Sequence, residues 1–196
     1  MLCLLVGQPN SGKTTFLINF AAFMGLPQIQ LTILQPQGSR STQSFPIVLA
    51  HKMLIAEEKH TTKSLQSINI TFPRGKKGRV IELVDSCGLR EGIHPDPNIR
   101  LAMAQTIEKM TFTRLALHII DLLNFDKELS LIDKEIKIYL EKKTKYCILA
   151  NKIDLENSLP KIDTLKALFP ATPIYPISAL YSLGFKEVYN YVFSHT

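Results

Sequence analysis

The chain has 196 residues, of which 45% are hydrophobic and 20% charged, and its formal net charge is +6. This composition fits one globular domain and excludes disordered and fibrous proteins, and no apolar run approaches the ~18 residues of a membrane-spanning helix. The positive charge fits an RNA, ribosome or anionic-membrane partner, and equally a well-solvated surface.

Strand-like and helix-like segments alternate along the chain. Apolar, β-rich runs predict strands at residues 2–6, 65–72, 80–84, 114–120, 146–150 and 174–177. Segments with helical periodicity lie at residues 13–24, 97–110, 127–141, 161–168 and 185–193. We therefore predict an α/β fold with a doubly wound, mostly parallel six-stranded sheet and helices on both faces. A short link between 65–72 and 80–84 predicts a hairpin and one antiparallel edge strand.

A glycine-rich motif follows the first predicted strand at the start of the first predicted helix. Gly7-Gln8-Pro9-Asn10-Ser11-Gly12-Lys13-Thr14 matches the Walker A pattern, in which backbone N–H groups surround phosphates. Lys13 would reach the outer phosphates as a catalytic residue, and Thr14 would give Mg²⁺ a hydroxyl ligand. A glycine-rich turn without a ligand is the alternative. The predicted nucleotide-binding residues of this segment are Gly7, Pro9, Asn10, Ser11, Gly12, Lys13, Thr14 and Thr15.

Asp85-Ser86-Cys87-Gly88 follows the strand predicted beside that loop. The pattern alone recurs by chance, but Mg²⁺ needs a second protein contact at this position, so Asp85 is a predicted metal residue. Gly88 could offer its amide to the terminal phosphate, which makes it a catalytic candidate. Cys87 fits a redox switch, or more simply a small apolar filler.

Asn151-Lys152-Ile153-Asp154 follows the fifth predicted strand and favours guanine over adenine. The carboxylate of Asp154 can accept two guanine N–H groups, Asn151 can serve N7, and Lys152 can cover the ring. A helix-capping turn is the alternative. Ser178, Ala179 and Leu180 follow the last strand, where the backbone amide of a small residue could donate to guanine O6.

In this order the motifs resemble those of translation-factor-type GTPases, and the first loop resembles Gly-x-Pro-Asn-x-Gly-Lys of the Era/TrmE-like branch, over essentially the whole chain. The resemblance implies a P-loop NTPase sheet, GTP/GDP and Mg²⁺ as cofactors, slow hydrolysis and a nucleotide-dependent switch. His60-Thr61-Thr62-Lys63 resembles the branch's switch I motif, which implies that Thr62, or Thr61, closes on Mg²⁺ and takes part in catalysis. The P-loop asparagine of this branch helps to hold K⁺, often across a dimer of G domains, so Asn10 is a further catalytic candidate; a turn residue after Pro9 is the other interpretation.

Two departures from the family matter. The stretch from Thr14 to Thr62 is longer than usual, so we expect one G domain over residues 1–196 with an enlarged switch I at about 25–60. Ile29–Leu34 in it predicts a strand, Gln35–Gly38 a turn and Pro46–Glu57 an amphipathic helix, either mobile or rigid. Leu89 stands where Ras-like enzymes place the glutamine that orients water, so hydrolysis needs another device.

Two other functions stay open, an ATPase and a binding module that holds its nucleotide without useful turnover. The three cysteines are too widely spaced for a disulfide framework and residues 1–6 do not form a signal peptide, so we expect a cytoplasmic protein. We expect no attached RNA-binding or membrane domain, an effector that the sequence does not identify, and possible contact with RNA or the ribosome. Basic residues cluster at 74–79 and at 134–145. The first cluster fits the tip of a hairpin, and the second fits the solvated face of a helix.

Overall fold

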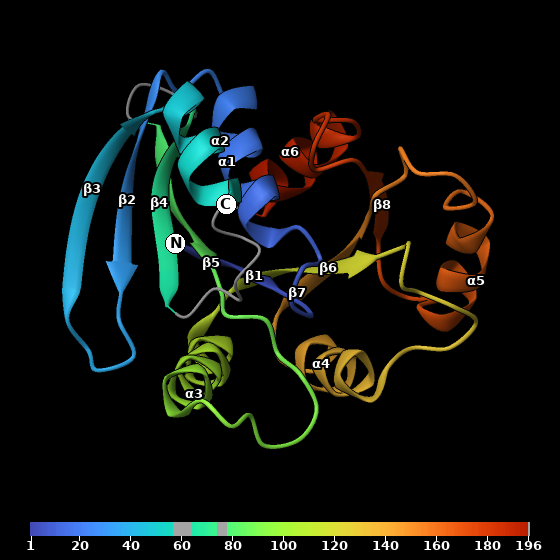
Figure 1. Cartoon of the computed structure of the whole chain (residues 1–196). Coiled ribbons are helices and arrows are strands. Elements are labelled where there is room, and N and C mark those ends of the chain that lie inside the picture. The colour runs from blue at the N-terminus through green and yellow to red at the C-terminus, as the bar shows by residue number, and fades with distance from the viewer. Residues whose placement is uncertain (57–63, 74–77, 196) are drawn as a thin grey trace.

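The computed structural model describes residues 1–56, 64–73 and 78–195, and in this part of the chain eight strands form one sheet in the order β3-β2-β4-β5-β1-β6-β7-β8 (Figure 1). Strands β1, β5, β6, β7 and β8 pair in parallel, whereas β2, β3 and β4 pair antiparallel. The strands are β1 (Leu2–Val6), β2 (Gln28–Leu34), β3 (Arg40–Pro46), β4 (Leu65–Phe72), β5 (Arg79–Asp85), β6 (Leu115–Asp121), β7 (Lys145–Asn151) and β8 (Ile174–Ile177).

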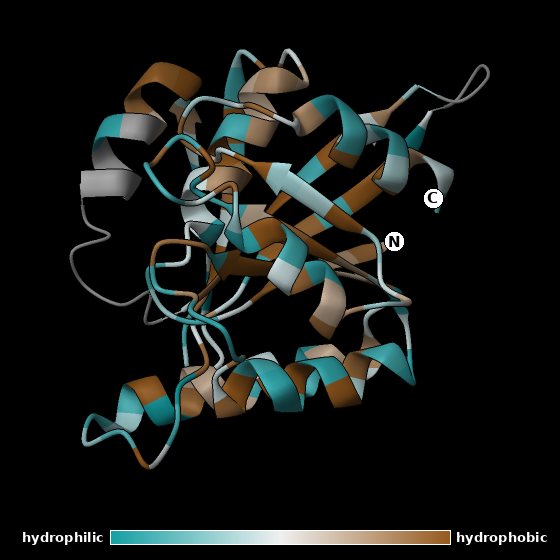
Figure 2. Cartoon of the chain, turned by 90° about the vertical axis from the view of Figure 1, so that its right-hand side faces the viewer, coloured by the Kyte–Doolittle hydropathy of each residue, from teal (hydrophilic) through white to brown (hydrophobic). Residues whose placement is uncertain are grey.

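Helices cover both faces of the sheet (Figure 1). The strands are mostly hydrophobic, and the helices on either side of them carry more hydrophilic residues (Figure 2). They are α1 (Lys13–Phe23), α2 (Ile47–Ala56), α3 (Pro97–Phe112), α4 (Leu131–Glu141), α5 (Lys161–Leu168) and α6 (Phe185–Ser194). No helix among the described residues has the length and apolar character needed to cross a membrane.

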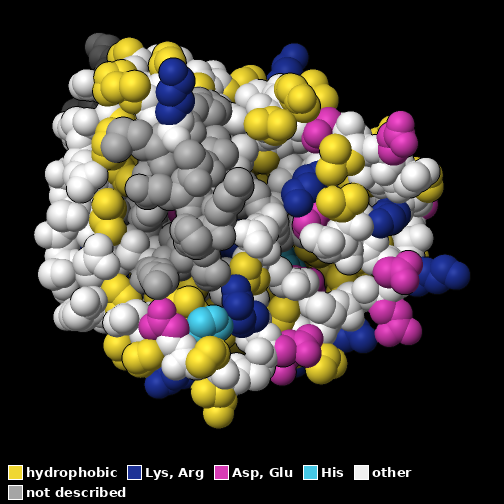
Figure 3. Space-filling model, viewed as in Figure 1, with side chains coloured by type: hydrophobic (Ala, Val, Ile, Leu, Met, Phe, Trp, Pro, Cys, Tyr) yellow, Lys and Arg dark blue, Asp and Glu magenta, His cyan; other side chains and the backbone are white. Residues whose placement is uncertain are grey.

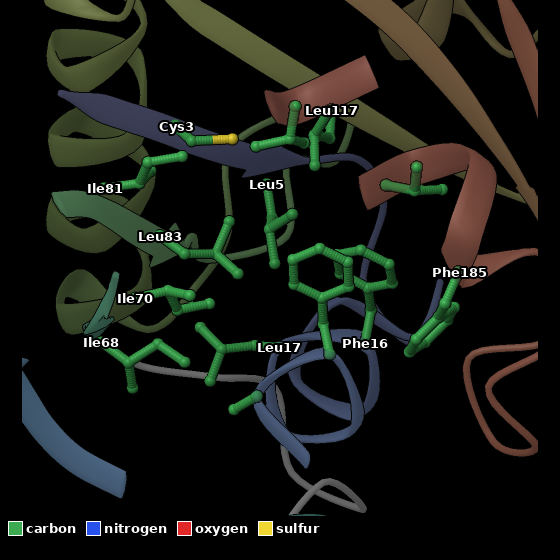
Figure 4. Packing of buried hydrophobic residues seen from close by; sticks show 14 of the residues in the cluster. Cys3, Leu5, Phe16, Leu17, Ile68, Ile70, Ile81, Leu83, Leu117 and Phe185 are labelled. Carbon is green, nitrogen blue, oxygen red and sulfur yellow. The ribbon is translucent and has the colours of Figure 1, made fainter. Parts of the chain in front are cut away.

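The central strand β1 is buried on both sides because helices pack on each. Cys3 and Leu5 point into the cluster that α1 and α6 cover, and Leu4 and Val6 point into the cluster that α4 and α5 cover. In the first cluster Phe16 of α1 contacts Phe185 of α6 edge to face, with ring centroids 5.0 Å apart (Figure 4). These two clusters fix the loops at the carboxyl ends of the parallel strands.

The predicted fold class is confirmed, and the sheet has more strands than the six expected. The hairpin of β4 and β5 is antiparallel as predicted, but β4 is not the edge of the sheet, because β2 pairs with β4 and β3 pairs with β2. Six of the seven residues of β3 are exposed and the seventh is only partly buried, so no apolar alternation marked this strand. The strand, turn and helix expected within residues 25–60 are present as β2, a turn closed by Gly38 N–H donating to Gln35 O, and α2.

Helix α4 begins later than the predicted residue 127. Ser130 is its N-cap, and the Ser130 hydroxyl accepts from the Asp133 N–H at 3.1 Å. In the first basic cluster, at 74–79, residues 74–77 lie outside the described residues. In the second cluster, at 134–145, the Lys137 ammonium donates to Leu168 O at 2.6 Å. Acidic and basic side chains are interspersed on the face of the molecule in Figure 3. That distribution is typical of a solvated surface.

Candidate functional site

The P-loop, residues 7–14, leads from β1 into α1 and packs tightly against the end of β7. Gly12 has φ 96°, and a Cβ atom there would lie 2.3 Å from Asn151 Nδ2. Glycine is therefore required at this position for its backbone conformation and for the space. Gly12 is also the N-cap of α1, and because glycine has no side chain it cannot cap the first N–H groups of the helix.

The side chain of Lys13 folds back over the loop. Its ammonium donates to Gln8 O at 2.6 Å and to Gly7 O at 3.3 Å, and the residue is only 5% exposed. A buried ammonium needs such partners because removing its charge from water is costly. Phosphate oxygens entering this loop would meet the same charge, together with the helix N-terminus.

The two described residues predicted to bind Mg²⁺ lie side by side. The Thr14 hydroxyl donates to Asp85 Oδ2 at 2.5 Å, and both residues are buried. Thr14 lies in the first turn of α1, which the P-loop connects to β1, and Asp85 ends β5, which pairs in parallel with β1. A hydroxyl and a carboxylate beside a phosphate-binding loop are the hard oxygen donors that Mg²⁺ prefers, so the donor set fits the ion.

The loop after Asp85 lies directly against the P-loop. Leu89 N–H donates to Gly7 O at 3.1 Å, and a Cβ atom on Gly88 would lie 2.5 Å from Pro9 N. The Gly88 backbone therefore lies against the phosphate loop, and its amide contact with the terminal phosphate stays a prediction. The Leu89 side chain is buried in the cluster with Leu4 and Val6, so it cannot orient a water molecule.

Asn151 joins the P-loop to the loop after β8. Its Oδ1 accepts from Ala179 N–H at 2.8 Å, and its Nδ2 donates to Ser11 O at 2.8 Å. The predicted contact with guanine N7 therefore has to come from the second hydrogen of that amide. Because Ala179 N–H already has a partner, the next amide, that of Leu180, becomes the candidate donor to guanine O6.

One pocket brings the predicted base-reading residues to the P-loop. The side chain of Asp154 is exposed at its rim, and Lys152 is held by an ion pair of 2.6 Å between its ammonium and Asp121 Oδ2. Ser178 is buried, and its hydroxyl accepts from Tyr181 N–H at 3.2 Å, so it shapes the loop. The pocket is lined by Asn10, Gly12, Thr15, Asn151, Lys152, Asp154, Leu155, Ala179 and Leu180.

Sequence reasoning missed two residues that support this pocket. Asn19, a polar residue inside the buried stretch of α1, donates from Nδ2 to Ala179 O at 2.6 Å and Leu180 O at 3.2 Å. Asp121, at the end of the apolar strand β6, holds Lys152. In both cases the signal in the sequence is a polar residue in an otherwise apolar segment. Such a side chain needs a hydrogen-bonding partner when it is buried, so its position points to a contact with another segment.

Two further predictions concern the threonines of switch I and the role of Cys87. Thr62 and Thr61 lie outside the described residues, so the switch I assignment stays a prediction. Cys87 is fully buried, and burial raises the pKa of its thiol although Lys13 and Arg90 oppose this. A buried, protonated thiol favours the filler interpretation over a redox switch.

The same fold occurs in solved structures of GTP-binding proteins. Era from Aquifex aeolicus bound to GDP and AlF₄⁻ has a TM-score of 0.64 at 21% identity, and the match covers 99% of this chain and 56% of that one. Era in complex with MgGDPNP and nucleotides 1506–1542 of 16S ribosomal RNA has a TM-score of 0.66 at 21% identity, with the same coverage. The FeoB G domain from Methanococcus jannaschii gives 0.56 at 18% identity, covering 99% of this chain and 96% of that domain. This chain thus spans 56% of the length of the Era chains.

The family comparison is made at the level of sequence. No curated protein matches the chain significantly. The model of a family described as 50S ribosome-binding GTPase matches residues 44–152, more than half of the chain. The match begins after the P-loop, so that loop is identified by its own sequence and geometry. The chain belongs to this family of GTPases.

Proposed function

We propose that this chain binds GTP and GDP with Mg²⁺, hydrolyses GTP slowly to GDP and phosphate, and acts as a nucleotide-dependent switch. The observation that carries the proposal is the pocket in which Asn10 and Gly12 of the P-loop and Thr15 of α1 meet Lys152 and Asp154. A nucleotide with its phosphates in the P-loop would place its base beside Asp154. Family membership and the nucleotides in the Era structures support the same ligand.

The phosphate end would be held mainly by charge and backbone N–H groups. Lys13 and the start of α1 would bind the outer phosphates, with Pro9 and Ser11 shaping the loop, and the Gly88 amide would meet the terminal phosphate. Thr14 and Asp85 would hold Mg²⁺, which neutralises charge on the phosphates when bound. We also assign Thr62, which follows the switch I insertion at about residues 25–60, to this group.

Guanine would be selected at the other end of the pocket. Asp154 would accept the two N–H groups on one edge of the base, and the Leu180 amide would donate to O6. The stem of Lys152, fixed by Asp121, would cover the ring. Adenine would leave the carboxylate without its N–H partners, so ATP should bind more weakly than GTP.

The test of guanine recognition is the Asp154→Asn variant. An amide pairs with a carbonyl where the carboxylate paired with an amino group, so we expect weaker GTP binding and stronger xanthosine triphosphate binding. Displacement of a fluorescent GDP by GTP, ATP and xanthosine triphosphate measures both. Glu156→Gln, which removes an exposed acid two residues away, is the matched control and should behave as wild type. Unchanged GTP affinity in Asp154→Asn would refute the assignment, and stronger displacement by ATP than by GTP would favour an ATPase.

Turnover is tested separately from binding. Phosphate release over several turnovers, measured with GTP and Mg²⁺, distinguishes a slow GTPase from a module that holds its nucleotide without hydrolysis.

For the effector we favour a ribosomal RNA contact, because the family description names the ribosome and the chain carries a net charge of +6. Binding of a labelled rRNA fragment should then weaken steeply with salt, and should differ between GDP and a non-hydrolysable GTP analogue. A nucleotide-dependent homodimer and a cytoplasmic location are part of the same proposal.

A further inference from the structure

A buried polar network lies at the N-terminus of α4, beside the P-loop but away from the pocket that contains Asp154. Asp133 is 4% exposed, and its Oδ1 lies 2.8 Å from His118 Nε2. Its Oδ2 accepts from Gln8 Nε2 at 2.6 Å and from the Ser130 hydroxyl at 2.8 Å. The other ring nitrogen of His118 lies 2.7 Å from the Tyr146 hydroxyl. The network therefore joins β6, β7 and α4 to the second residue of the P-loop.

The carboxylate of Asp133 is the centre of this network. Burial raises the pKa of Asp133, but the hydrogen bonds from His118, Ser130 and Gln8 and the charge of His118 lower it, and the result lies below its ordinary value. An ionised carboxylate only accepts hydrogen bonds, so His118 Nε2 carries the hydrogen and donates it. Gln8 thus makes a charge-assisted bond, which is stronger than a bond between neutral groups.

Gln8 connects this network to the phosphate-binding lysine. Its side chain bonds to Asp133, while its backbone carbonyl accepts from the Lys13 ammonium at 2.6 Å. The backbone of Gln8 is thereby held from two directions. The loop after Asp85 reaches the same helix end, because Glu91 Oε1 accepts from Leu131 N–H at 3.2 Å.

We propose that Gln8 is a positioning residue for nucleotide binding, which the Gln8–Asp133–His118 network holds so that the Gln8 carbonyl keeps Lys13 over the phosphate site. The proposal rests on the function proposed above. It assigns a role to a P-loop position that the Walker A pattern leaves unspecified, and to a histidine and an aspartate that do not line the pocket containing Asp154.

The test exchanges the donor and the acceptor of the Gln8–Asp133 bond. Gln8→Glu places two carboxylates in contact, and Asp133→Asn removes the charge, so each single variant should release fluorescent GDP about tenfold faster than wild type, as expected when a charge-assisted bond is lost. The double variant places the carboxylate at position 8 and the amide at 133, which restores a bond of the same kind. We expect its release rate to return to within about twofold of wild type.

Two further variants make the result specific. Gln8→Met keeps the length of the side chain without its amide and should also release GDP faster, and it leaves the buried members of the network unchanged. Glu128→Gln removes an exposed charge from the rim of the hollow beside Gln8 and should behave as wild type. Circular dichroism at the assay temperature verifies that each variant is folded.

The outcomes separate the two proposals. Wild-type release rates in folded Gln8→Glu and Gln8→Met would overturn the positioning role, while GDP binding by the wild type would leave the proposed function intact. Fast release in the single variants without recovery in the double variant would overturn it too, since general damage would then explain the losses. If the wild-type chain fails to bind GDP, the proposed function fails first and the positioning role falls with it.

Discussion

Lys13 and Thr14 are adjacent in the sequence but serve different parts of the proposed ligand. We expect Lys13→Ala to weaken binding of a fluorescent GTP analogue by about 10–100-fold, because the lost ammonium makes charge-assisted hydrogen bonds of roughly 1.5–3 kcal/mol. Thr14→Ala should mainly weaken the dependence on Mg²⁺, since it removes the hydroxyl that lies beside Asp85. Titration of Mg²⁺ at fixed nucleotide separates the two effects.

Thr14→Ser is the matched control for this prediction. It retains the hydroxyl at the same position and should keep both nucleotide affinity and the Mg²⁺ requirement close to wild type. Wild-type binding in both alanine variants would mean that the P-loop does not hold phosphates.

Gly12 allows a second prediction, in which backbone strain and steric contact can be separated. Gly12→Ala should destabilise the fold by about 2–4 kcal/mol, because a left-handed backbone with a side chain costs about 1–2 kcal/mol and the new methyl group displaces buried Asn151 from its partners. Gly38 has φ 92° with open space around its Cβ position, so Gly38→Ala should show the strain alone. Urea denaturation of both variants measures the difference, and equal losses would show that the contact with Asn151 is unimportant.

Motifs in the sequence predicted which residues of the site lie together, whereas the roles of these residues stay predictions. Thr14 and Asp85 were expected near one ion and lie in contact, and Asp154 was expected at a base and lies on a pocket that reaches the P-loop. The bonding of Asn151 was not predictable in detail, because its partners come from segments far apart in the chain. The same holds for Gln8, whose position in the Walker A pattern is unspecified and whose partner Asp133 belongs to α4.

The β2–β3 hairpin shows at the level of elements what periodicity can predict. Ile29 and Leu31 of β2 are buried and alternate with exposed residues, so this strand was recognisable. Strand β3 is mostly polar and exposed, so only its pairing with β2 defines it. The start of α4 was placed too early because Asp126 is as good a potential cap as Ser130, and tertiary contacts decide between them.

Leu31 gives the prediction for this element. It is fully buried in the cluster under α1 and α2, so Leu31→Ala should reduce the free energy of unfolding by about 2–5 kcal/mol. Gln30→Ala, on the exposed side of the same strand, should change it by less than about 0.5 kcal/mol. Denaturant unfolding measures both, and a negligible effect of Leu31→Ala would mean that the hairpin does not pack on the core.

At the scale of the whole molecule, the topology explains why separate motifs form one site. Parallel strands β1, β5, β7 and β8 all end at the same edge of the sheet, where they release the P-loop, Asp85, Asn151 and Ser178 (Figure 1). Ligands of open α/β sheets bind at this edge. The order of the motifs was therefore enough to predict a shared site, although the eight-stranded extent of the sheet was not.

GTP hydrolysis by this chain needs a group that takes the place of the glutamine found in Ras-like enzymes, because Leu89 stands at that position. Leu89 is apolar and buried, so another group would have to position the attacking water, and hydrolysis also needs a charge that offsets the one developing between the β and γ phosphates. We expect Asn10 to help hold K⁺ for this purpose, as the resemblance to the Era/TrmE-like branch implies. Asn10 is exposed on the P-loop with φ 60°, a conformation that also suits a plain turn residue.

The measurement that decides is kcat for GTP in matched K⁺ and Na⁺ buffers at several protein concentrations. Turnover in Na⁺ should be that of an unassisted GTPase, on the order of 10⁻⁴–10⁻² s⁻¹. K⁺ should raise it at least about tenfold, equivalent to ~1.4 kcal/mol of the barrier, and Asn10→Ala should abolish the difference. Asn157→Ala replaces another exposed asparagine with a left-handed backbone, φ 63°, and should keep the K⁺ response. A response that grows with protein concentration would place the ion at a dimer of G domains. Equal wild-type rates in both salts would exclude K⁺ and leave a residue supplied by a partner as the source of the missing charge.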